Sequence, residues 1–179
     1  RIRALENLVK ATDELVAFQR QSLEIGRGQI HTLNIATAAN TAAKIRLLSE
    51  TDPDSQQLEA LRAARIDSLS KLVQILRRRY QDGTDNLPRV LAAEIRLAEA
   101  QIDYSTTSNQ RVEAIKRIQT ATEKTVEYQQ VRLSVGSGRE DDLHLATAAA
   151  LGVQIRLLQE TEPDSPKIKE LQVSKRDAL

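Results

Sequence analysis

The fold is decided by a stretch that occurs twice: residues 36–55 read ATAANTAAKIRLLSETDPDS, and residues 146–165 read ATAAALGVQIRLLQETEPDS. Around this stretch, residues 1–69 align without a gap with residues 111–179 and are identical at 26 of 69 positions. A match of this extent indicates an internal duplication with an offset of 110 residues. Repeats of this kind are built from supersecondary units that pack on their neighbours.

Apolar residues recur along the chain at alternating steps of three and four, which places them along one face of a helix. One such stripe comprises Leu8, Ala11, Leu15, Phe18, Ser22 and Ile25. Several segments carry a second apolar stripe beside the first, so we expect those helices to contact neighbours on two sides. The pattern predicts seven helices, over residues 1–26, 29–51, 54–81, 86–105, 109–135, 139–161 and 166–179.

These helices predict an all-α fold of consecutive antiparallel helical hairpins, in an elongated bundle or stack with the internal 110-residue repeat. We expect a single helical-repeat region over residues 1–179, with hairpin turns near 26–28, 83 and 136–138. The first glycine of each turn is expected to end a helix in the left-handed conformation: Gly26, Gly83 and Gly136. Two helix starts are expected to be capped by a side chain that precedes a proline. These are Asp52 before Pro53 and Ser165 before Pro166.

The composition narrows the possible functions. Lys and Arg number 26 and Asp and Glu 25, and this balance argues against a nucleic-acid partner, which would require clustered positive charge. Cys is absent, which excludes a disulfide, a thiolate metal site and a cysteine nucleophile. No segment has the roughly 18 consecutive apolar residues of a membrane-spanning helix. Because the chain opens on Arg1, we expect it to be a fragment of a longer protein.

Three motifs contain residues that often form ligand-binding or metal sites, and each also has a simpler structural interpretation. The Gly-x-Gly pairs at 26–28 and 136–138 lack the third glycine and the preceding strand of a dinucleotide site, so we interpret them as turns. The run Arg77-Arg78-Arg79 suits the carbonyl end of a helix, with its side chains in solvent. One local group of residues has side chains of the kinds that bind metals: Glu140, Asp141, Asp142 and His144. Its acidic residues also suit the first turn of a helix.

Neither histidine has a catalytic partner in the sequence. His31 and His144 lie at predicted helix starts, without a serine at a spacing that would suit a dyad. Acidic and basic residues are interspersed along the polar faces, as expected for ion pairs on exposed helices. We therefore expect no enzyme activity and no cofactor.

A motif in the middle of the chain resembles a known family. Arg79-Tyr80-x-x-Gly83 is followed by Val90-Leu91-x-Ala93-Glu94 and by Ala100. This pattern resembles the TolC-type outer-membrane efflux family, in which an Arg/Ser-Tyr-x-x-Gly turn precedes a helix with Val-Leu-x-Ala-Glu. In that family the turn is the periplasmic tip of a long hairpin and docks against an adaptor protein. The resemblance implies periplasmic hairpin repeats, here without the family's strands, in a periplasmic or cell-envelope setting.

The sequence thus predicts a non-enzymatic structural or protein-interaction module of the cell envelope. We expect a protein partner or self-association through helix faces or hairpin tips, in a homo-oligomer or larger assembly. The residues expected to contact a partner are those of the tips: Gly26, Arg27, Gly28, Asp82, Gly83, Gly136, Ser137 and Gly138. Two alternatives stay open, namely a component of an outer-membrane efflux transport system and a periplasmic protein that buffers or senses metal.

Overall fold

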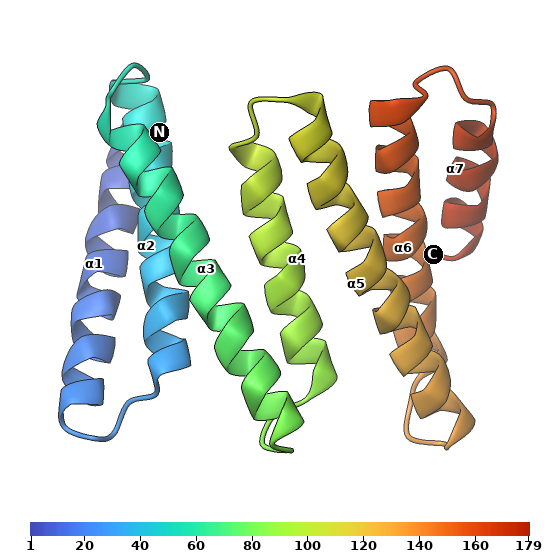
Figure 1. Cartoon of the computed structure of the whole chain (residues 1–179), viewed down its shortest axis with the longest axis horizontal. Coiled ribbons are helices and arrows are strands. Elements are labelled where there is room, and N and C mark those ends of the chain that lie inside the picture. The colour runs from blue at the N-terminus through green and yellow to red at the C-terminus, as the bar shows by residue number, and fades with distance from the viewer. The chain divides into compact units, whose positions relative to one another are not determined.

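The computed structural model describes all 179 residues and is all-helical, with 82% of the chain in helices and no strand. The seven helices are α1 (Ile2–Glu24), α2 (Ile30–Thr51), α3 (Gln57–Gln81), α4 (Leu87–Asp103), α5 (Ser108–Ser134), α6 (Glu140–Thr161) and α7 (Lys167–Asp177) (Figure 1). Their number and order confirm the prediction, and every boundary lies within three residues of the expected one. None of these helices combines the length and apolar character needed to cross a membrane.

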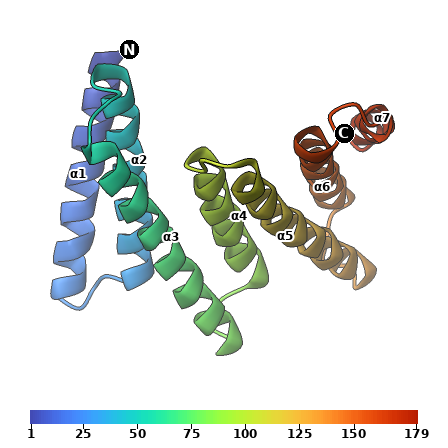
Figure 2. The same ribbon diagram turned by 45° about the horizontal axis from the view of Figure 1, so that its top comes forward.

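The chain divides into two compact units, Arg1–Asp85 and Asn86–Leu179. In the first unit, α2 packs against both α1 and α3. In the second unit, α5 packs against α4 and α6, and α6 also packs against α7 (Figures 1 and 2). The expected contacts on two sides are therefore present for α2, α5 and α6, whereas α1 contacts only α2 within its unit.

Small residues allow the central helix of the first unit to pack on two sides. The alanines at positions 36, 38 and 43 of α2 are buried, and Ile45 on the same helix is buried with them. From α3, Leu69, Leu72 and Leu76 are buried as well. Because an alanine extends only one carbon from the backbone, two neighbouring helices can approach α2 closely without a gap in the core.

The core of the second unit is centred on α5. Ala98 and Ile102 of α4 form one buried cluster with three residues of α5: Ala114, Ile115 and Ile118. Val153 and Leu157 of α6 pack against the same cluster from partly buried positions. The side chain of Ile115 is fully buried, so α5 lies between two helices that each cover one of its faces.

The helix starts differ from the sequence expectation at two places. Asp52 does not cap α3; it lies at the end of α2, where its backbone N–H donates to the carbonyl of Leu48 at 2.7 Å. Residues 53–56 form a turn, and α3 begins only at Gln57. Ser165 likewise provides no side-chain cap for α7, where Pro166 occupies the cap position. The prediction failed because neither proline occupies the first helical position: Pro53 lies within the turn before α3, and Pro166 lies at the cap position before α7.

Side-chain caps are present instead at two other helix starts. The Asn86 side chain accepts a hydrogen bond from the N–H of Arg89 at 3.1 Å, at the start of α4. The Thr107 hydroxyl accepts one from the N–H of Gln110 at 3.3 Å, at the start of α5. Each cap satisfies one of the backbone donors that the first helical turn leaves unpaired.

Candidate interaction surfaces

The three glycine turns share one backbone conformation. Gly26, Gly83 and Gly136 have φ of +71°, +70° and +72°, which confirms the predicted left-handed conformation. In each turn the residue after this glycine donates its N–H to a carbonyl five residues earlier, over 2.9, 2.8 and 2.9 Å: Arg27 to Ser22, Thr84 to Arg79 and Ser137 to Arg132. These are the hydrogen bonds of a Schellman motif, which satisfies carbonyls at a helix end. The turns are therefore fixed by backbone bonds.

Two of the turns contain a second glycine with a different role. A Cβ on Gly28 would lie 2.5 Å from the backbone nitrogen of Leu23, and one on Gly138 would lie 2.7 Å from that of Leu133. The N–H of Gly28 donates to the carbonyl of Ser22 at 2.7 Å. These glycines are thus required because the chain folds back against the preceding helix, and they present no side chain to a partner.

The side chains at the tips differ in how much the turn depends on them. Arg27 and Asp82 are exposed. Ser137 is also exposed, but its hydroxyl donates to the carbonyl of Arg132 at 3.2 Å. The Thr84 hydroxyl makes the corresponding bond to the carbonyl of Arg79 at 3.1 Å. Ser137 therefore supports its own turn, and its expected contact with a partner stays a prediction.

Arg79 connects two of the turns within the first unit. Its Nη1 lies 3.4 Å from Oε1 of Gln29 and 3.4 Å from Nδ1 of His31, both at the start of α2. Its Nε lies 3.4 Å from Oδ2 of Asp85, whose side chain is 1% exposed, and its Nη2 donates to the carbonyl of Thr84 at 3.4 Å. The turn at 26–28 and the turn at 83 consequently lie at the same end of this unit.

This role of Arg79 differs from the sequence interpretation, which places all three consecutive arginines in solvent. The structure leaves Arg77 and Arg78 exposed but brings Arg79 against the buried His31. Consecutive helical residues point in directions about 100° apart, so one of three must face inward when a neighbouring helix is present. The available signal is the Arg79-Tyr80-x-x-Gly83 motif, which places an arginine at a fixed distance before the turn.

The acidic set at the start of α6 does not form a cluster. Glu140, Asp141 and Asp142 occupy the first turn of this helix, and Asp141 pairs with Arg139 at 3.2 Å. His144 is exposed on the next turn. No group of three or more His, Cys, Asp or Glu residues in the structure is placed to hold a metal ion.

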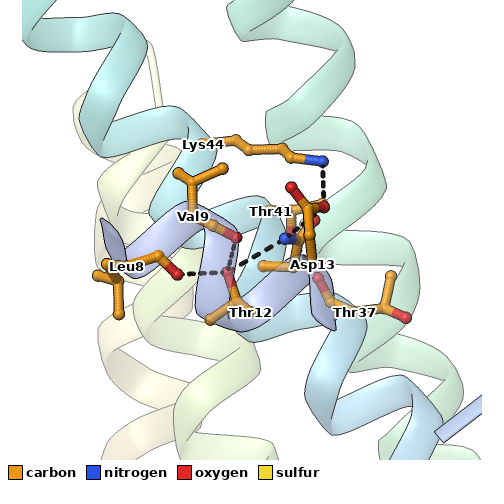
Figure 3. Close-up of polar contacts among 8 residues, drawn as sticks. Leu8, Val9, Thr12, Asp13, Thr37, Thr41 and Lys44 are labelled. Carbon is orange, nitrogen blue, oxygen red and sulfur yellow. Dashed lines mark hydrogen bonds and ion pairs between the residues drawn. The ribbon is translucent and has the colours of Figure 1, made fainter. Parts of the chain in front are cut away.

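A polar network joins α1 to α2 (Figure 3). The Asn40 amide donates to the Thr12 hydroxyl at 3.1 Å and to Oδ1 of Asp13 at 3.0 Å, while Nζ of Lys44 donates to the same carboxylate oxygen at 2.8 Å. The bond from Lys44, assisted by Asn40, lowers the pKa of Asp13 from its ordinary 3.8 despite an opposing effect of burial. In the second unit, Glu123 keeps a carboxylate at the position aligned with Asp13. Ala150 and Gln154 replace Asn40 and Lys44 there, so the lysine ammonium that pairs with Asp13 has no counterpart.

An apolar stripe on α1 is exposed to solvent. Leu8, Leu15 and Phe18 are 41%, 43% and 61% exposed, and Ala11 between them is exposed as well. No residue of α1 is buried. The stripe is the one noted in the sequence, and the side of α1 that packs on α2 carries other residues, among them Leu5, Val9 and Val16. Clustered exposed apolar residues of this kind mark interaction sites in soluble proteins.

No protein-family model matches the chain, and no curated protein or solved structure matches it significantly. The resemblance to the TolC-type family therefore rests on the motif between Arg79 and Ala100 and stays a prediction.

Proposed function

We propose that the chain is a non-enzymatic protein-interaction module, built from two copies of one hairpin unit and located in the cell envelope. The observation that carries this proposal is the exposed stripe of Leu8, Leu15 and Phe18 on α1. None of these three large apolar side chains belongs to the buried core of the unit. Their burial against a partner would be favourable, at about 25 cal/mol for each square ångström of apolar surface removed from water.

The proposed duplication is supported by matching turns in the two units. The turn at 26–28 and the turn at 136–138 make the same backbone hydrogen bonds at residues 110 apart. The ends of α2 and α6 also correspond, since Asp52 and Glu162 each donate to a carbonyl four residues earlier at 2.7 Å. We infer that the hairpin of α1 and α2 and the hairpin of α5 and α6 descend from one ancestral hairpin, and that α3 and α4 come from a related one.

The glycine tips form the second proposed contact surface. Arg27 and Asp82 are exposed beside turns whose shape is fixed by backbone bonds, so these side chains are available to a partner. In the first unit, Arg79 holds the two tips at one end, which brings both within reach of a single docking protein. The envelope location and the docking at tips follow from the resemblance to the TolC-type hairpins.

Site-specific photo-crosslinking in cells that make the protein tests this proposal. A photoreactive amino acid at Leu15 would lie in the apolar stripe, and one at Arg27 would lie at a tip. Ala17 is the matched control, because it is exposed on the same helix but on the opposite face. We expect a defined crosslinked protein from Leu15 or Arg27 and none from Ala17. Equal crosslinking at all three positions, or none at any, would contradict the proposal.

A further inference from the structure

The residues of α1 and α5 that align at an offset of 110 differ in burial along one face. Leu8 is 41% exposed, whereas the aligned Ile118 is 4% exposed. The same contrast holds for smaller residues, since Ala4 and Ala11 are exposed and their counterparts are buried: Ala114 and Ala121. The open face of α1 therefore corresponds to a face of α5 that is covered.

The helix that covers this face of α5 is α4. Its residues Ile95, Ala98 and Ile102 pack in the same cluster as Ile115 and Ile118. They form a stripe at steps of four and three that also includes the buried Leu91. A polar contact supports this packing, because Nη1 of Arg117 on α5 donates to Oε1 of Gln101 on α4 at 2.9 Å.

The open face of α1 is more apolar than the face that α4 covers. Leu15 occupies the position aligned with Thr125, and Phe18 occupies the position aligned with Tyr128. Both residues of α5 are partly buried, whereas Leu15 and Phe18 are exposed. A helix that packs on α1 as α4 packs on α5 would thus bury at least as much apolar surface.

We propose that the open face of α1 binds an amphipathic helix of the α4 type, supplied by a partner protein. The apolar stripe of this helix would combine small and large residues, as the stripe of α4 does with Leu91, Ile95, Ala98 and Ile102. This inference deepens the proposed function, on which it rests, by stating the chemistry of the partner. It follows from how this chain itself covers the aligned face in its second unit. The mode of recognition is a helix laid along an apolar groove, with anchors one helical turn apart.

Titration of a fluorescent peptide of residues 86–105 with the full 179-residue chain tests this proposal, with anisotropy as the readout. We expect saturable binding. The double variant Leu8→Lys, Leu15→Lys should weaken it by at least about tenfold, because two charges would lie under the peptide. The matched control is Glu6→Gln, Ala17→Lys, which raises the net charge by the same amount on the opposite face of α1 and should bind like the original chain. A peptide with Ala98→Glu and Ile102→Glu should also bind at least about tenfold more weakly.

Three results would overturn the proposal: no binding by the original chain, equal binding by both double variants, or a dimer of the chain alone that Leu8→Lys, Leu15→Lys dissociates. The last would assign the face to a second copy. Circular dichroism and urea unfolding of both variants show whether they fold. Failure here can be separated from failure of the proposed function. Crosslinks from Leu15 in cells without peptide binding would mean a partner of other chemistry, whereas peptide binding without crosslinks would remove the cellular role.

Discussion

Nη1 of Arg79, in the last turn of α3, lies 3.4 Å from Nδ1 of His31, in the first turn of α2. His31 is 4% exposed, so this contact is made in a buried part of the first unit. The same guanidinium lies beside the buried carboxylate of Asp85. Arg79 thereby joins two helix ends that are about 50 residues apart in the sequence.

The first prediction concerns this arginine. Replacement of Arg79 by Ala should lower the free energy of unfolding by about 1–3 kcal/mol, because buried polar groups of His31 and Asp85 lose a charged donor. The neighbouring Arg78 is exposed, and its replacement by Ala should change stability by less than about 0.5 kcal/mol. Urea unfolding of both variants measures the difference. Equal effects would show that Arg79 is an ordinary surface residue.

The second prediction separates the two kinds of glycine. Gly26 has φ of +71°, and a Cβ added to it would have nothing within 4 Å, so Gly26→Ala should cost only backbone strain, about 1 kcal/mol. Gly28→Ala should cost more, because its Cβ would overlap the backbone of the preceding helix. Arg27→Ala is the control and should leave the melting temperature nearly unchanged. A smaller effect at Gly28 than at Gly26 would contradict this assignment.

The third prediction concerns acid. The pKa of Asp13 is lowered by Lys44 and Asn40, so its charged form is favoured in the folded chain. This contribution to stability is fully present above the ordinary pKa of 3.8 and is lost as the pH falls through the lower folded value. Because the pair is half exposed, we expect an effect of only about 0.2–1 kcal/mol. The difference in unfolding free energy between the original chain and Asp13→Asn should shrink below about pH 4. An unchanged difference would contradict the assignment.

The fourth prediction concerns the aligned faces of α1 and α5. The chain contains no cysteine, so single substitutions give one reactive thiol each. Leu8→Cys should react with a thiol reagent at nearly the rate of an unfolded control, whereas Ile118→Cys should react at least about tenfold more slowly, because only local opening exposes a core position. Equal rates in the purified chain would show that the two faces are covered to the same extent.

The helices and turns could be predicted from the sequence because each depends on local residues. The left-handed conformation of Gly83 follows from a glycine placed just after a periodic apolar segment. The sequence predicts that α3 begins at residue 54, three residues before its observed start at Gln57. The error arises because a proline suits both a turn and the first turn of a helix.

The interaction surfaces could be predicted only in part. The burial of a side chain depends on which helices pack against it, and a periodic pattern does not specify those helices. The stripe of Leu8, Leu15 and Phe18 has the spacing of any core-facing stripe, and only the arrangement of helices shows that nothing in its unit covers it. The inward position of Arg79 depends in the same way on the nearby start of α2. The tip glycines are correctly placed in turns by the sequence, while their role in binding stays a proposal.

The most direct test of the account is to compare thiol labelling of Leu8→Cys in the purified chain with labelling in cells that make the protein. The account predicts rapid labelling of the purified chain and protection in cells, because a partner covers the face of α1. Ala17→Cys, on the opposite face, should label equally in both settings. Rapid labelling of Leu8→Cys in both settings would mean that the stripe is unoccupied, and it would contradict the claim that this chain acts through that surface.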